Sequence, residues 1–221
     1  MMCGRQLLVV GDGRMAARTH STQTPMPTVK EIEDARRSFV AGEPRYLFYQ
    51  VAIELIDLAR RNLTRVSVAE ALAVLLQTWN VSFYRFRGGF TDEDLTRIKG
   101  LLIDHNAMIE AHRHRSISSL TSGELDALRM LFSHFEDVLG PVGAAKSLHL
   151  LAPSFFPLWD NAIAKAYGVK LGRNAPDGYI RFMQISKEQC RVLTEQGAPW
   201  PDLLKAVDEY NYCTHVLNSK S

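Results

Sequence analysis

The stretch VLGPVGAAKSLHLLAPSFFPLWDNAIAKAYG, residues 138–168, contains the strongest local signals in this chain. Two glycines, Gly140 and Gly143, interrupt an apolar helical pattern that ends near Leu139 and resumes near Ala144. Glycine permits the backbone angles of a tight turn, and the N–H groups at the start of the following helix can bind an anion such as phosphate. The stretch therefore predicts a glycine hairpin between two helices.

An aspartate follows this hairpin at the start of a further helix. Pro157 favours a bend, and Asp160 directly precedes the helical sequence NAIAKAY, residues 161–167. An aspartate in this position accepts hydrogen bonds from the first N–H groups of the helix and so caps it. We expect Asp160 either to act as a cap alone or to serve also as the charged group of a site.

The order of these features resembles the helix-hairpin-helix DNA glycosylase superfamily, which includes the endonuclease III type. The segment LGPVGAA, from Leu139, is similar to the family's LPGVG hairpin with glycine and proline exchanged. The segment PLWDNAIAKAYG, from Pro157, is similar to its VDTHVxRV segment and puts Asp160 at the catalytic aspartate. Upstream, ALAVLLQTWNV resembles an early helix with a Gln-Gln-Thr or Gln-Ala-Thr element, so that the resemblance covers roughly residues 68–168.

The resemblance implies an enzyme that rotates a damaged or modified base out of double-stranded DNA and hydrolyses its bond to deoxyribose. It implies a monofunctional N-glycosylase in which the Asp160 carboxylate stabilises positive charge on the sugar. The implied DNA-binding residues are Gly140, Val142, Gly143, Ala145 and Lys146. The residues expected at the base pocket, or between the bases, are Gln77, Trp79, Asn80, His149 and Trp159.

The chain departs from the family at two sets of residues. In bifunctional members a lysine lies two residues after the second hairpin glycine, where this chain has Ala145, so the sequence assigns no Schiff-base role to Lys146. Members with an iron–sulfur cluster need four closely spaced cysteines, and this chain has Cys3, Cys190 and Cys213. The histidines form no helical ligand pattern with a carboxylate. We therefore expect no cofactor and no metal.

Composition fits a single domain or two closely packed lobes. The 221 residues are 46% hydrophobic, and the net charge of +2 requires any DNA binding to depend on local basic patches, since phosphate neutralisation supplies such affinity. No apolar run approaches the roughly 20 residues of a membrane helix. Three scattered cysteines are typical of a reducing compartment. We expect a monomeric, cytoplasmic, nucleoid-associated protein. Candidate patches are Arg85 with Arg87, the run from His112 to Arg115, and Lys146, Lys165, Lys170 and Arg173.

Apolar residues at helical spacing predict an all-α, two-lobed protein with a helix-hairpin-helix. The expected helices cover about 28–41, 45–62, 67–83, 91–112, 122–139, 143–152, 161–167, 177–195 and 199–212. The expected lobes are 67–140 on one side and 28–66 with 141–221 on the other. Residues 1–27 read as a disordered extension, because the LLVVGDGRMAA sequence from Leu7 lacks the helix that a nucleotide-binding loop would open.

Two other functions remain open from the sequence. The chain could be a DNA-binding module that has the hairpin without the chemistry, or a helical protein-interaction domain in which the glycines form an ordinary turn. Each candidate residue also has a structural interpretation, since Trp79 and Trp159 can be core aromatics and His149 a buried or surface histidine. The identity of the base does not follow from the sequence, because its pocket would draw on several helices.

Overall fold

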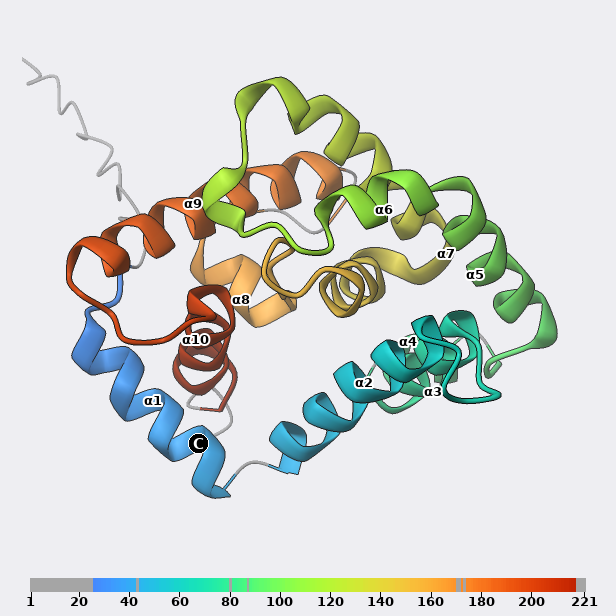
Figure 1. Cartoon of the computed structure of the whole chain (residues 1–221), viewed down its shortest axis with the longest axis horizontal. Coiled ribbons are helices and arrows are strands. Elements are labelled where there is room, and N and C mark those ends of the chain that lie inside the picture. The colour runs from blue at the N-terminus through green and yellow to red at the C-terminus, as the bar shows by residue number, and fades with distance from the viewer. Residues whose placement is uncertain are drawn as a thin grey trace, which may run out of the picture.

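The structure is a computed structural model that describes residues 26–42, 44–79, 81–86, 88–169, 172 and 174–217 (Figure 1). Within these ranges every regular element is helical and no strand occurs, which confirms the predicted all-α class. Most of the predicted N-terminal extension lies outside the described residues, as do Asn80, Arg87, Lys170 and Arg173.

Ten α-helices lie in the described part of the chain. They are α1 (Val29–Gly42), α2 (Pro44–Arg60), α3 (Val68–Trp79), α4 (Val81–Phe86), α5 (Asp92–Asp104), α6 (Asn106–His112), α7 (Leu125–Leu151), α8 (Asn161–Ala166), α9 (Ala175–Glu195) and α10 (Leu203–Asn211). Two single-turn 3-10 helices, η1 (Ile117–Ser119) and η2 (Ser122–Glu124), precede α7, and α10 continues into a π-helix, η3 (Tyr212–Leu217).

Local capping chemistry explains where several helices begin. Before α5, the Thr91 hydroxyl accepts a hydrogen bond from the Asp94 N–H at 3.2 Å, and the Asp94 carboxylate accepts one from the Thr91 N–H at 2.9 Å. This reciprocal capping box satisfies two N–H groups that the helix itself leaves without a partner. A second capping box joins Thr121 and Glu124 ahead of α7. These starts agree with the expected helices that begin at about residues 91 and 122.

The predicted glycine hairpin is a one-residue kink. Only Gly140 leaves the helical conformation, with φ 69° and ψ 167°, and the helix resumes at Pro141, so that the two predicted helices form one bent helix, α7. Proline suits this place because the first residue of a helix has no use for its own N–H. Figure 1 shows the two halves of α7 running in clearly different directions.

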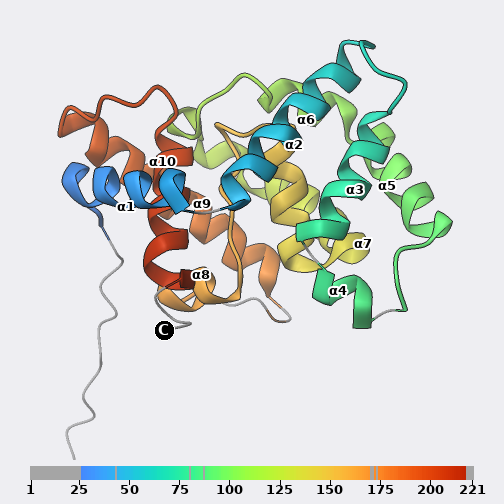
Figure 2. The ribbon, with the colours of Figure 1, turned by 90° about the horizontal axis from the view of Figure 1, so that it is seen from below.

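The half of α7 after the kink forms the centre of the molecule. Every residue from Gly143 to Leu151 is buried except Lys146, which is half-buried. A helix that is enclosed on all sides needs partners on all sides. Helices α2, α3, α5 and α9 all pack against α7. In Figures 1 and 2, α1, α8, α9 and α10 lie to one side of α7 and α2 to α5 lie to the other.

The kink is held from outside by an aromatic ring. A methyl group added to Gly140 would lie 2.8 Å from the Phe83 ring of α4, closer than carbon atoms approach one another. The backbone angles of Gly140 are also those that side chains rarely adopt. Both constraints require glycine at this position.

We predict that Gly140→Ala destabilises the protein by about 2–4 kcal/mol, because backbone strain and the clash with Phe83 add together. Gly100→Ala is the matched control, since Gly100 lies inside α5 with open space around it. It should stabilise the protein by about 0.5–1 kcal/mol through helix propensity alone. Urea unfolding of both variants measures the difference. Equal stabilities would contradict the constraint at Gly140.

A charged cluster fixes the start of α7. The Glu124 carboxylate accepts hydrogen bonds from Arg115 at 2.7 and 3.0 Å and from the Thr121 N–H at 2.6 Å. The Arg115 guanidinium is the main reason that the pKa of Glu124 is lowered to about 2. The carboxylate therefore stabilises the fold above its ordinary pKa of 4.5, and this stabilisation decreases as the pH falls toward 2.

We predict that Glu124→Gln lowers the free energy of unfolding by about 1–3 kcal/mol at pH 7. The difference from the wild type should shrink to less than about half of this at pH 3, where the wild-type carboxylate stabilises less. Chemical unfolding at the two pH values tests it. Glu93→Gln is the control, because the exposed Glu93–Arg97 pair should contribute less than about 1 kcal/mol at either pH. A pH-independent difference for Glu124→Gln would contradict the assignment.

Candidate functional site

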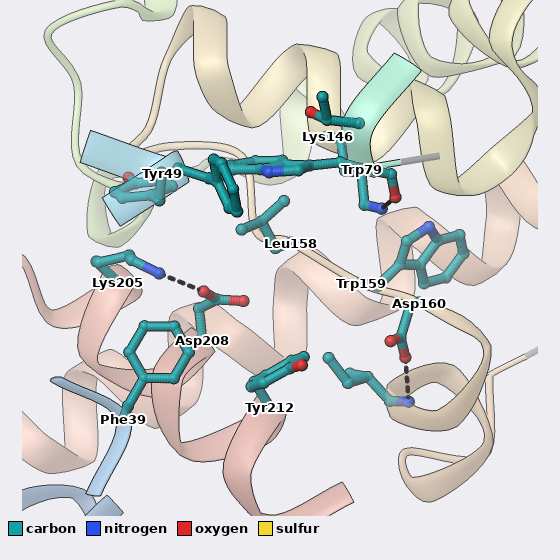
Figure 3. A pocket seen from close by; sticks show the side chains of 13 residues that line it. Phe39, Tyr49, Trp79, Lys146, Leu158, Trp159, Asp160, Lys205, Asp208 and Tyr212 are labelled. Carbon is teal, nitrogen blue, oxygen red and sulfur yellow. Dashed lines mark hydrogen bonds and ion pairs between the residues drawn. The ribbon is translucent and has the colours of Figure 1, made fainter. Parts of the chain in front are cut away.

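A pocket of about 420 Å³ lies where α1, α2, α3, α7, α8 and α10 come together (Figure 3). Four of the residues predicted for the site line it, namely Trp79, Lys146, Trp159 and Asp160. They come from the end of α3, the buried half of α7 and the loop before α8. The fold thus brings together residues that are up to 81 positions apart in the sequence.

Asp160 caps α8 and faces the pocket. Its Oδ1 atom accepts hydrogen bonds from the N–H groups of Ala162 and Ile163, both at 2.9 Å. These two bonds fix the plane of the carboxylate, and no described residue bonds to Oδ2. In Figure 3 this second oxygen is turned toward the centre of the pocket. Asp160 is therefore both a structural cap and an available carboxylate.

The loop between α7 and α8 is held rigidly by side chains that bond to carbonyl groups. The His149 Nδ1–H donates to the Phe156 carbonyl at 2.7 Å, and the Tyr179 hydroxyl donates to the Pro157 carbonyl at 2.9 Å. The Trp159 indole N–H donates to the Pro141 carbonyl at 3.1 Å, which ties the loop to the kink in α7. The position of Asp160 is thus set by the same buried core that surrounds α7.

His149 lies behind the pocket wall and is fully buried. Its Nδ1 bonds the Phe156 carbonyl, and its Nε2 lies 3.0 Å from the Tyr49 hydroxyl, which donates to it. Burial lowers the pKa of His149, so the ring is neutral at pH 7. Burial also raises the pKa of Tyr49, with Asp202 adding to the effect. His149 therefore orients Tyr49, which lines the pocket, and does not itself face a ligand.

Lys146 is attached to the end of α3. Its ammonium group donates a hydrogen bond to the Trp79 carbonyl, which belongs to the last residue of that helix. A cation is favourable there because the final carbonyls of a helix carry partial negative charge. This contact joins α7 to α3 at the pocket wall and holds Lys146 as a fixed positive group.

The two tryptophans of the predicted site have different surroundings. Trp79 is half-buried, and its ring lies parallel to that of Tyr49, with centroids 6.2 Å apart and an interplanar angle of 8°. Trp159 is 1% exposed and packs against core aromatics, including Phe132 and Tyr179. Trp79 presents an aromatic face to the pocket, whereas Trp159 closes its wall from within the core and is not placed to insert between bases.

Other predicted residues lie away from the pocket lining. Gln77 is exposed and does not line the pocket, although the neighbouring Thr78 does. In the kink, Gly140 and Val142 are partly exposed. Gly143 and Ala145 are buried, and neither is exposed where it could contact DNA. The structure thus leaves Gly140, Val142 and Lys146 as the accessible members of the predicted DNA-binding set.

The basic run from His112 to Arg115 has structural partners. Arg113 pairs with Asp57 at 3.3 Å, and Arg115 pairs with Glu124 at 2.7 Å. His112 is buried, with its Nδ1 bonded to the Met108 carbonyl at 2.7 Å. These side chains hold α2, α6 and η2 together. This run is thus occupied with stabilising the fold.

The structure adds residues to the site that sequence patterns did not indicate. Lys205 and Asp208 of α10 form an ion pair of 2.7 Å in the pocket wall, and their side chains are only 10% and 11% exposed. Tyr49 and Tyr212 also line the pocket. A lysine and an aspartate three residues apart on a helix are typical of a solvated face. One sequence signal of their burial was available, because the adjacent residues Leu204, Ala206 and Val207 are apolar.

The π-helix η3 brings a histidine close to Asp160. Burial lowers the pKa of His215, and the negative charge of Asp160 raises it by a smaller amount. Its Nε2 atom is buried and has no hydrogen-bond partner among the described residues.

Within the same described ranges, no group of three or more His, Cys, Asp and Glu side chains could hold a metal ion.

Comparison of this chain with protein-family models, with curated proteins and with solved structures finds no match. Among the described helices, none has the length and apolar character needed to cross a membrane. The case for a function therefore depends on the geometry and chemistry of the pocket.

We predict that the stability of the protein falls as the pH decreases from 7 to 5, in part because His149 takes up a proton in the unfolded chain that its buried site in the folded protein disfavours. Its folded pKa lies below the ordinary value of 6.5, so the unfolded chain binds the proton first. His149→Gln can keep both hydrogen bonds and should flatten this pH dependence by up to about 1.4 kcal/mol per pH unit. Unfolding curves at several pH values measure the slope.

The control for this experiment is His114→Gln, because His114 is exposed. Its slope should match that of the wild type. A His149→Gln slope that also matches the wild type would show that His149 does not titrate on unfolding in this range.

Proposed function

We propose that this protein is a monofunctional DNA N-glycosylase that holds a flipped-out base in the pocket and hydrolyses its bond to deoxyribose beside Asp160. The observation that carries the proposal is the position of Asp160, whose Oδ1 is fixed by two backbone hydrogen bonds while Oδ2 faces the pocket. The resemblance of the segment around Asp160 to the glycosylase superfamily supports the same residue in the same role.

The chemistry of the bond requires a group of this kind. As the bond between C1′ and the base nitrogen breaks, the base leaves with the bonding electron pair and positive charge develops on the sugar. The Asp160 carboxylate stabilises that charge and orients a water molecule. The water oxygen bonds to C1′, one of its protons goes to Asp160 and on to the departing base, and the products are a free base and an abasic deoxyribose. No further reactant is needed.

The pocket suits a planar ring in size and lining. Its volume of about 420 Å³ falls within the range of roughly 300–1,000 Å³ that small-ligand sites occupy. The rings of Tyr49 and Trp79 lie in its wall and are nearly parallel to one another. A flipped base that stacks on the Trp79 ring gains energy that offsets part of the energy lost on leaving the DNA stack.

The surroundings of Lys146 favour hydrolysis over attack by an amine. An amine that attacks C1′ must be free to approach the sugar and must lose a proton. The Lys146 ammonium is instead bound to the Trp79 carbonyl. It contributes positive charge at the pocket wall, where it can attract a DNA phosphate.

Exposed side chains on the helices that follow two pocket residues in the sequence can contact DNA. Arg85 is exposed on α4, which follows Trp79 in the sequence, and Lys165 is exposed on α8, which follows Asp160. Beside Arg85, Phe86 is 81% exposed, with the guanidinium 5.4 Å from the centre of its ring. An exposed aromatic ring next to a cation suits contact with unstacked bases and phosphate.

We predict that the wild-type protein releases a free base from genomic or modified phage DNA, and that Asp160→Asn lowers the rate on the order of 10²–10³-fold or more. Asparagine caps a helix about as well as aspartate, so the variant should fold and bind DNA normally. Mass spectrometry of the released bases measures the reaction and identifies the base.

The matched control is Asp202→Asn. Asp202 also caps a helix, with Oδ1 accepting a hydrogen bond from the Lys205 N–H at 3.1 Å, but it does not line the pocket. This variant should release the base at close to the wild-type rate. If the wild type releases no base yet binds DNA in a salt-sensitive way, the protein is a non-catalytic DNA-binding module. If it does not bind DNA either, a protein-interaction domain becomes the better explanation.

A further inference from the structure

The pocket contains a buried ion pair that the proposed hydrolysis does not use. Lys205 and Asp208 project from successive turns of α10, with the Lys205 ammonium 2.7 Å from Asp208 Oδ2. Both side chains are about nine-tenths buried and both line the pocket. Figure 3 places this pair at one end of the pocket and Asp160 at the other.

Such a pair is costly for a protein to keep. Removing two charges from water costs several kcal/mol per ion, and an apolar pair of similar volume is often equally stable or more so. The neighbouring Glu209 carboxylate does not need Lys205 as a counterion. Glu209 pairs with Arg36 at 2.7 Å, whereas the Lys205 ammonium is 3.9 Å from Glu209. The Lys205–Asp208 pair lines the pocket, where its charges can contact a ligand.

The aromatic lining restricts the ligand that can reach this pair. The Lys205 ammonium lies 4.1 Å from the centre of the Tyr49 ring. The Tyr49 and Trp79 rings, parallel within 8°, appear edge-on and at one level in Figure 3, so that they form one flat apolar face. The Lys205 ammonium therefore covers the Tyr49 part of this face and leaves the Trp79 part for a ligand, and Tyr212 lies on the opposite side of the pocket.

A second observation concerns Trp79. Its indole N–H is buried and has no hydrogen-bond partner among the described residues. This N–H points along the plane of the ring and is enclosed by the protein, so Trp79 offers a base the face of its ring and not a hydrogen bond.

We propose that Lys205 and Asp208 recognise the edge of a nucleobase that stacks on the Trp79 ring, and so determine which base the pocket accepts. The Lys205 ammonium donates to a carbonyl oxygen or ring nitrogen of the base. The Asp208 carboxylate accepts from the adjacent N–H. The ligand class is thus a planar heterocycle with an acceptor and a donor side by side on one edge, which bases use in pairing.

This arrangement accounts for the separation of the two aspartates. A base stacked on the aromatic face with its edge at Asp208 has its sugar bond directed to the other end of the pocket, where Asp160 lies. The inference rests on the proposed function for the sugar attached to the base. The recognition step itself involves only the base and can be measured without any hydrolysis.

The test is calorimetric titration of the full-length protein with free hypoxanthine and with 1-methylhypoxanthine. The methyl group removes the N–H donor beside the carbonyl and leaves Asp208 without a partner, so the methylated base should bind at least about tenfold more weakly. Adenine and uracil, titrated in parallel, show which donor and acceptor order is preferred. Equal affinity for hypoxanthine and its methylated form, or no binding of any base, would overturn the proposal.

Variants of the pair test the residues. Asp208→Asn alone leaves a buried ammonium without its counterion and can impair folding, so the second variant is the double substitution Lys205→Met with Asp208→Leu, which keeps the volume and removes both charges. The double variant should melt near the wild-type temperature and lose at least tenfold in hypoxanthine affinity. The control replaces the exposed pair Glu188 and Arg191 of α9 by Gln and Met, and should bind as the wild type does. Unchanged affinity in a folded double variant would contradict base recognition by this pair.

The two proposals fail in different ways. If hypoxanthine binding depends on Lys205 and Asp208 but no DNA loses a base, recognition stands and the glycosylase proposal falls. If bases are released with dependence on Asp160 while the double variant retains the rate and the same choice of base, the glycosylase proposal stands and recognition by the pair falls.

Discussion

The buried half of α7, Gly143 to Leu151, is the constraint on which the rest of the structure depends. A helix that is enclosed on every side cannot lie at the surface, and the other helices must surround it. Because Lys146 is its one residue that is not fully buried, the enclosure is open at a single place, and the pocket lies there. The position of the pocket is thus determined by the way the other helices pack around α7.

The same constraint determines how the chain leaves α7. The carbonyls of the following loop are buried and need donors, and core side chains supply them, with His149 bonded to Phe156 and Tyr179 bonded to Pro157. The Trp159 indole N–H donates to the Pro141 carbonyl and so holds the loop against the kink in α7. Asp160 directly follows Trp159, so these contacts with the core also fix the position of Asp160. A carboxylate fixed in this way loses little entropy when it acts on a bound ligand.

Much of this fold could be predicted from the sequence, because helix caps and apolar spacing are local signals. The starts at Thr91 and Asp160 are examples. The geometry of the turn at Gly140 could not be predicted, because a four-residue hairpin and a one-residue kink contain the same glycines. The Phe83 ring beside Gly140 comes from α4, which is distant in the sequence. Of the predicted residues that line the pocket, Lys146, Trp159 and Asp160 belong to the stretch 138–168, and Trp79 belongs to the upstream segment of the same resemblance. Lys205 was missed because a lysine and an aspartate at helical spacing are typical of a solvated face, and the apolar residues beside it were the one local signal of burial.

The two aspartates of the pocket show how one side chain acquires two uses. Asp160 is held by backbone N–H groups, which leave one oxygen available and add no competing cation. Asp208 is held by Lys205, so it presents a donor and an acceptor together and little net charge. The first arrangement suits a positive charge that develops only during a reaction, and the second suits a neutral polar edge. A pocket with these groups at opposite ends differs chemically from one end to the other, and that asymmetry is what the proposed ligand, a base joined to a sugar, requires.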